Sequence, residues 1–87
     1  MSLLRAAGLV LAATGAAHFA APKAFEPISR LPFPNDTDAW IKRNGATELA
    51  LGLAVSLKKT RKIGVAGTVA YTAWLGARVA GGLKNAS

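Results

Sequence analysis

Three ionisable side chains, His18, Glu48 and Arg78, fall in three different apolar runs of the sequence. An ionisable group inside a hydrophobic helix costs several kcal/mol unless it is paired, so each of the three is a candidate functional residue. Proton relays and quinone headgroup sites use residues of these types, and structural ion pairs use them too. The residue types therefore predict either a small polar site or a buried structural contact.

The positions of these residues predict that they meet. At about 1.5 Å per residue, each lies within roughly 10 Å of the same end of the helical bundle. A Glu48–Arg78 ion pair with His18 beside it would offset the desolvation of all three groups. Other arrangements stay open: Arg78 can extend to the membrane surface, His18 can cap a helix end, and Glu48 can stay neutral in a hydrogen bond.

Beyond this intramembrane polar cluster, the sequence offers little catalytic material. It has no cysteine, one His and four acidic residues, which excludes disulfides and thiolate metal sites. One His and one buried carboxylate do not make a metal set, and no nucleophile has a base and an orienting partner. We expect no catalytic residue, no metal and no resident cofactor, with a quinone only if the chain serves redox chemistry.

Composition indicates a single membrane domain over residues 1–87. Hydrophobic residues make up 52% and charged residues 17% of the chain, and most charges lie outside the apolar runs. Such segregation is typical of bilayer proteins. The net charge of +7 does not indicate nucleic acid, because the basic residues bracket the apolar runs without interleaved aromatics. Anionic lipids are the expected counter-charge.

The predicted fold class is all-α, an integral membrane bundle of three transmembrane helices. They are expected at about residues 3–21, 37–57 and 62–83. The first run covers about 28 Å, close to one hydrocarbon thickness. Its Arg5 and small-residue end also fit a secretory signal peptide, but two further membrane-like segments follow. The second reaches span length only by beginning near 35–38, where side chains can cap a helix.

Small residues recur every four positions along the third run and predict a helix-packing face. They are Gly64, Thr68, Thr72, Gly76 and Ala80. A chain this rich in Gly and Ala also produces such a ladder by chance, and that alternative stays open.

A dense basic turn separates the second and third runs. Its charged residues are Lys58, Lys59, Arg61 and Lys62. The positive-inside rule places this turn in the cytoplasm of a bacterium, at the plasma (inner) membrane, where it can also meet lipid headgroups. The N-terminus is then cytoplasmic and the C-terminus lies outside.

The connection over residues 22–36 holds all four prolines, which predicts that no regular helix runs through it. Phe25, Ile28, Leu31 and Phe33 make it apolar as well. We expect a proline-rich segment that lies in the membrane interface or folds over the helix ends. A plain solvated loop is the alternative, and it would leave four large apolar side chains in water.

Several of these residues follow one another in a recognisable order. They are Gly15-Ala16-Ala17-His18-Phe19, Pro22, Phe25, Pro32, Pro34, Asn44-Gly45-Ala46-Thr47-Glu48-Leu49, Gly52 and Thr60-Arg61-Lys62. The pattern resembles the DoxX family of small bacterial membrane proteins. That resemblance implies a compact helical membrane fold and, for some relatives, a role as membrane subunits of sulfur or quinone oxidoreductases. Members commonly have four helices, so it also implies that this chain lacks the last one.

The leading functional prediction is a non-catalytic accessory or scaffold subunit of a larger integral membrane complex. The first alternative is a membrane subunit of a quinone- or sulfur-linked oxidoreductase, in which His18, Glu48 and Arg78 line a small site. The second is a small pore or transporter, which the scarcity of polar residues disfavours.

Overall fold

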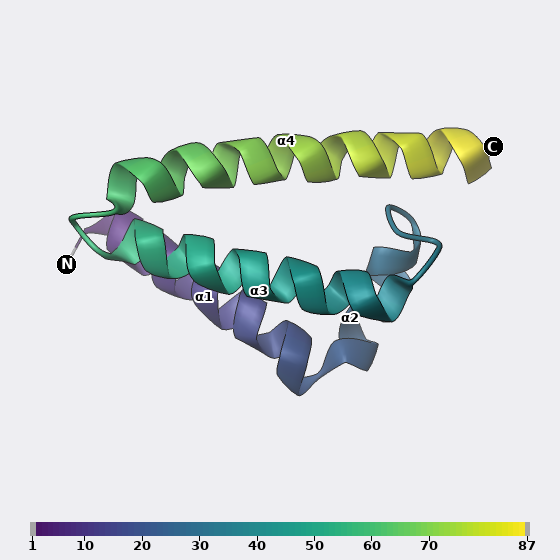
Figure 1. Cartoon of the computed structure of the whole chain (residues 1–87), viewed down its shortest axis with the longest axis horizontal. Helices are drawn as coiled ribbons and strands as arrows, with labels where there is room; N and C mark the ends of the chain where they lie inside the picture. Colours follow the sequence, from purple (N-terminus) through teal and green to yellow (C-terminus); the bar gives the residue numbers. More distant parts are fainter. Residues whose placement is uncertain (1, 87) are drawn as a thin grey trace.

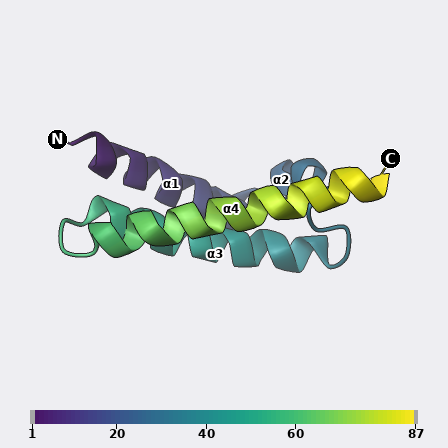
Figure 2. The ribbon, with the colours of Figure 1, turned by 90° about the horizontal axis from the view of Figure 1, so that it is seen from above.

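Four α-helices form the computed structural model over residues 2–86, the part of the chain that the structure describes (Figure 1). They are α1 (Leu3–Ala20), α2 (Pro22–Arg30), α3 (Thr37–Ser56) and α4 (Arg61–Ala86). α1 and α3 lie antiparallel, and α4 returns along α3 so that the two chain ends lie at opposite ends of the molecule (Figure 2). The chain is therefore all-helical, as predicted.

The predicted three transmembrane helices are wrong. Of the described helices, only α1 is long and apolar enough to cross a membrane, a test that signal sequences and the core helices of soluble proteins also pass. α3 carries Asp38, Lys42, Arg43 and Glu48 within its 20 residues, and each charge opposes entry into hydrocarbon. In α4, glycines and threonines take the place of large apolar residues. The helices lie where the apolar runs predict them, but length alone misjudged two of them as spans.

The prediction that residues 22–36 contain no helix is wrong for the first half. α2 begins at Pro22, at the helical position where a missing N–H is not needed, and it continues through Pro27. It ends at Arg30, before the next two prolines. Phe33 is only 1% exposed, so the segment after α2 folds onto the helix ends and is not a solvated loop.

Glycines bring α1 and α3 to backbone contact. A Cβ added at Gly8 would lie 2.6 Å from the Gly52 carbonyl oxygen, and one at Gly15 would lie 2.5 Å from the Gly45 carbonyl oxygen. A Cβ at Gly52 would in turn press on the backbone nitrogen of Ala12. Only hydrogen fits at these positions, so this glycine seam sets the distance between the two helices.

α4 packs on α3 and on no other helix of the described chain. A Cβ at Gly64 would lie 2.6 Å from the Val55 nitrogen, and Thr68 is half-buried. The other members of the predicted packing ladder, Thr72, Gly76 and Ala80, are exposed. Four residues rotate a helix by about 400°, so each step of the ladder turns about 40° away from α3. The ladder therefore leaves this interface after its second member.

Candidate functional site

One residue from each long helix contributes to a polar cluster between the helices, formed by His18, Glu48 and Tyr71. The Tyr71 hydroxyl donates a hydrogen bond of 2.8 Å to Glu48 Oε2, and His18 Nε2 lies 3.6 Å from the same oxygen. His18 and Glu48 are 5% and 9% exposed. The Glu48 carboxylate thus has two polar partners in a site that is nearly closed to solvent.

Local structure fixes the histidine ring. Its Nδ1 lies 2.7 Å from the Thr14 carbonyl oxygen, one turn earlier in α1, so Nδ1 carries the hydrogen and donates it. Phe25 of α2 stacks on the ring with centroids 3.8 Å apart. These two contacts turn Nε2 toward Glu48.

Tyr71 is the member of the polar cluster that the sequence did not reveal. Burial raises the pKa of its phenol well above the ordinary value, and the hydrogen bond to Glu48 and the Glu48 charge raise it further. The phenol therefore stays protonated and acts as a donor at neutral pH. One signal was available, because Tyr71 lies seven residues, or about two turns, from Gly64 and so shares its α3-facing side.

Arg78 lies outside the polar cluster. Its Nε donates to the Pro32 carbonyl oxygen at 3.1 Å, and its guanidinium carbon lies 4.8 Å from the Phe33 ring centre. The expected Glu48–Arg78 ion pair is absent among the described residues. Arg78 is level with Trp40, and Glu48 lies eight residues, or about 12 Å, further along α3. The sequence placed Glu48 and Arg78 at similar depths by counting residues from the expected ends of their helices. Those ends do not lie at the same level in the structure, so the two residues are offset along the bundle.

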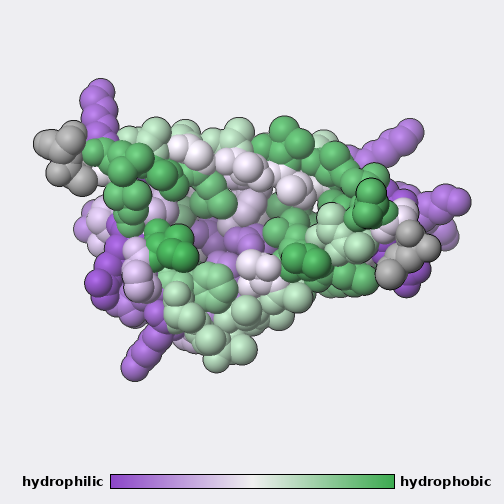
Figure 3. Space-filling view, turned by 180° about the vertical axis from the view of Figure 1, so that it is seen from behind, coloured by the Kyte–Doolittle hydropathy of each residue, from purple (hydrophilic) through white to green (hydrophobic). Residues whose placement is uncertain are grey.

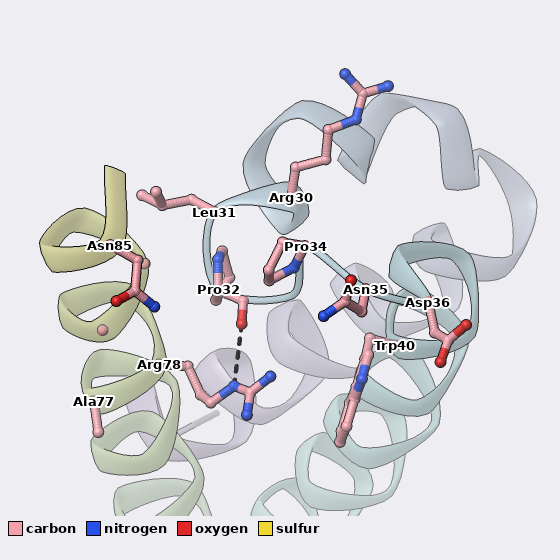
Figure 4. Close-up of a pocket in the computed structure, with 12 residues that line it drawn as sticks. Arg30, Leu31, Pro32, Pro34, Asn35, Asp36, Trp40, Ala77, Arg78 and Asn85 are labelled. Carbon is pink, nitrogen blue, oxygen red and sulfur yellow. Dashed lines mark hydrogen bonds between the residues drawn. The ribbon is translucent and has the colours of Figure 1, made fainter. Parts of the chain in front are cut away.

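A cavity of about 570 Å³ opens beside Arg78, and we call it the Arg78 pocket (Figure 4). Its walls are the segment from Arg30 to Asp36, Trp40 of α3, and the last turns of α4. No member of the polar cluster lines it. The three candidate residues from the sequence are thus divided between a closed pair, His18 and Glu48, and an arginine at an open pocket.

The basic turn has one structural member and three exposed ones. Arg61 Nε and Nη2 donate to the carbonyl oxygens of Val55 and Ser56, at 2.8 and 3.2 Å, and so cap the end of α3. Lys58, Lys59 and Lys62 are exposed. The three lysines are therefore the members of the turn that can meet an external anion.

No group of three or more His, Cys, Asp or Glu side chains that could hold a metal ion occurs within residues 2–86. In the polar cluster, His18 and Tyr71 both approach one oxygen of the Glu48 carboxylate.

Comparison with known proteins identifies a family for the chain. No curated protein and no solved structure is significantly similar to the chain. A family model described as a domain of unknown function, DUF8561, matches residues 7–86. This match does not name the DoxX family, so that resemblance stays a prediction. Since the model covers nearly the whole chain, the protein belongs to the DUF8561 family.

Proposed function

We propose that this protein is a non-catalytic accessory or scaffold subunit of a larger membrane complex and that α4 is the helix that docks on the partner. The observation that carries the proposal is an exposed apolar stripe along α4, which at Val69 borders an apolar groove shared with Leu4 and Leu11 of α1. We call it the outer stripe. Its members are Ala66, Val69, Ala73, Gly76, Ala80 and Leu83.

The spacing of the outer stripe is that of a helix-packing seam. Its members alternate at three and four residues, which keeps them on one face of a helix. Val69 and Leu83 are 65% and 57% exposed. Between them, a Cβ at Gly76 would meet nothing within 4 Å, so the helix surface is open there. Large apolar residues with small ones between them suit the close approach of a second helix.

The rest of the surface supports a hydrophobic partner. Within the described residues, thirteen large hydrophobic side chains are exposed, whereas the buried hydrophobic residues are Ala12, Phe33, Ile41 and Val55. Figure 3 shows hydrophobic colours along the α4 edge and in patches below it, with hydrophilic residues between the patches and projecting at both ends of the long axis. A small protein that keeps this much apolar surface uncovered is expected to bind another apolar surface. An integral membrane protein offers one.

Site-specific photo-crosslinking tests the proposal. A photoreactive residue at Val69 should give a stoichiometric adduct with one larger membrane protein when the chain is expressed in its own cells. The matched control position is Ile28 of α2, which is 75% exposed and lies outside the outer stripe. We expect no such adduct from Ile28. Equal labelling from both positions, or adducts only between copies of this chain, would overturn the proposal.

The two alternative functions gain no comparable support. A quinone site lined jointly by His18, Glu48 and Arg78 would need the arginine beside the carboxylate, and the two lie about 12 Å apart along the bundle. The oxidoreductase subunit and the small pore therefore stay predictions from the sequence.

A further inference from the structure

Arg78 is exposed, makes three contacts through its guanidinium group and has no acidic partner among the described residues. Pro32 accepts a hydrogen bond from its Nε, and its guanidinium lies over the Phe33 and Trp40 rings, at 4.8 and 5.6 Å. Glu48 faces His18 and Glu26 pairs with Arg30, and no ion pair joins Arg78 to an acidic side chain within residues 2–86. An arginine held by these contacts has already lost part of the conformational entropy that binding would cost.

The free edge of this arginine faces the Arg78 pocket. Figure 4 shows both terminal nitrogens directed into the space between α4 and Trp40. Because Nε is bonded to Pro32, the terminal edge is the one that remains for a ligand, and such an edge binds oxyanions in a bidentate manner. Asp36 also lines the pocket, but its carboxylate points away from Arg78 (Figure 4).

Two amides add neutral donors beside the arginine. Asn35, before α3, and Asn85, in the last turn of α4, line the pocket from different walls, and no side-chain hydrogen bond occupies either within the described residues (Figure 4). Gly82 packs directly on the Leu31 carbonyl, which brings the end of α4 close to the loop. Any side chain at Gly82 would separate these walls.

We infer that the Arg78 pocket binds a phosphate group, with Arg78 as the bidentate donor and the two asparagine amides as its neutral donors. Donor groups that reach the cavity from α4 and from the loop before α3 suit a tetrahedral phosphate, which accepts in several directions, better than a planar carboxylate. The cavity of about 570 Å³ also leaves room for the organic group that carries the phosphate. This inference does not depend on α4 docking to a partner.

The phosphate can belong to a soluble phosphate ester or to a phospholipid headgroup, and the test separates these sources. Trp40 and Trp74 are the two tryptophans of the chain, and their ring centres lie 5.6 Å apart. Both rings contact Phe33, over which the Arg78 guanidinium lies. Intrinsic fluorescence therefore reports on the site. The probes are inorganic phosphate and glycerol phosphate in one arm, and phosphatidylglycerol in detergent micelles, with phosphatidylcholine as its control, in the other.

We expect a saturable change in tryptophan emission in at least one arm, and the arm that saturates identifies the source. Arg78→Gln and Asn85→Ala should each weaken binding, the first by about tenfold or more, equivalent to about 1.4 kcal/mol. Arg78→Lys keeps the charge but loses the paired guanidinium donors, so it should also weaken phosphate binding. The matched control is Arg43→Gln, because Arg43 lies 5.0 Å from the Trp40 ring centre and does not line the pocket.

Three results would overturn the inference. The first is the absence of saturation with every probe up to about 10 mM, the millimolar limit of weak specific binding. The second is an equal loss of affinity in Arg43→Gln and Arg78→Gln, and the third is wild-type affinity in both Arg78→Lys and Asn85→Ala. Because Asn85 is exposed at the end of α4, its substitution leaves the fold intact and keeps the test informative. Crosslinking from Val69 would be unaffected by any of these results.

Discussion

Glu48 is the residue through which three helices share one polar contact. Its carboxylate accepts from Tyr71 of α4 and faces His18 of α1, while its own backbone belongs to α3. A buried carboxylate is tolerated only when its hydrogen bonds are made, so each partner restricts where the other helices can lie. The contact therefore favours this arrangement of the three helices over others.

A double-mutant cycle tests the Glu48–Tyr71 contact. Glu48→Gln and Tyr71→Phe should each destabilise the protein, and their coupling energy should be about 1.5–3 kcal/mol, as for hydrogen bonds to charged groups. The same cycle with Arg78→Met in place of Tyr71→Phe should show coupling below about 0.5 kcal/mol, because the two residues share no partner. Urea unfolding supplies the free energies. Strong coupling between Glu48 and Arg78 would contradict the observed geometry.

Tyr71 also predicts a loss of stability in alkali. Because its pKa is raised in the folded protein, the folded state holds the phenolic proton more tightly than the unfolded state does. The contribution is complete below the ordinary tyrosine pKa of about 10 and is lost as pH rises above it. Tyr71 is the sole tyrosine, so tyrosinate absorbance should appear only as the protein unfolds. Tyr71→Phe should lessen the alkaline fall in the melting temperature, and a tyrosinate signal near pH 10 in folded protein would contradict this account.

At the scale of the element, glycines act oppositely in the seam between α1 and α3 and on the outer face of α4. In the seam, Gly8 and Gly52 face each other so closely that a Cβ at Gly52 would lie 2.5 Å from the Gly8 oxygen. On α4, Gly76 faces open space and only weakens its helix. The same residue type therefore has a packing role in one place and leaves an uncovered surface in the other.

Matched alanine substitutions separate the two roles. Gly52→Ala should destabilise the protein by about 1–3 kcal/mol, since overpacking forces α1 and α3 apart. Gly76→Ala should be neutral or stabilising by up to about 1 kcal/mol, because alanine favours the helix and meets no neighbour. The comparison uses urea unfolding of both variants under one condition. A neutral Gly52→Ala would mean that the helices are not in backbone contact.

Local patterns in the sequence predicted the positions of the helices better than the contacts between them. Apolar runs located α1, α3 and α4 to within three residues, because helix bounds depend on nearby residues. The pairing of Glu48 with Tyr71 depends instead on how far α4 slides along α3, which no local pattern encodes. The prolines misled for a related reason: Pro22 opens a helix, so its effect depends on its position within α2.

At the scale of the whole molecule, the packing is uneven. α1 and α3 bury each other through the glycine seam. Among the residues of α4 whose burial the structure describes, Gly64 alone is buried. Beyond Gly64, α4 is held by Tyr71 and by the contacts of Arg78 and Trp74 with the loop and α3. A helix attached at few points along one side is the part most able to gain order from a partner.

Hydrogen exchange should reveal this unevenness. In the isolated chain, backbone amides of α4 beyond Tyr71 should exchange faster than those of α1 and α3, because fewer buried contacts must break to expose them. When the partner complex is intact, the same α4 amides should slow markedly, whereas the α1 and α3 amides at the glycine seam should change little. Mass spectrometry of the exchanged peptides measures both states in one experiment. If α4 amides are already as protected from exchange as α3 amides in the isolated chain, α4 packs completely without a partner. That result would contradict docking through the outer stripe.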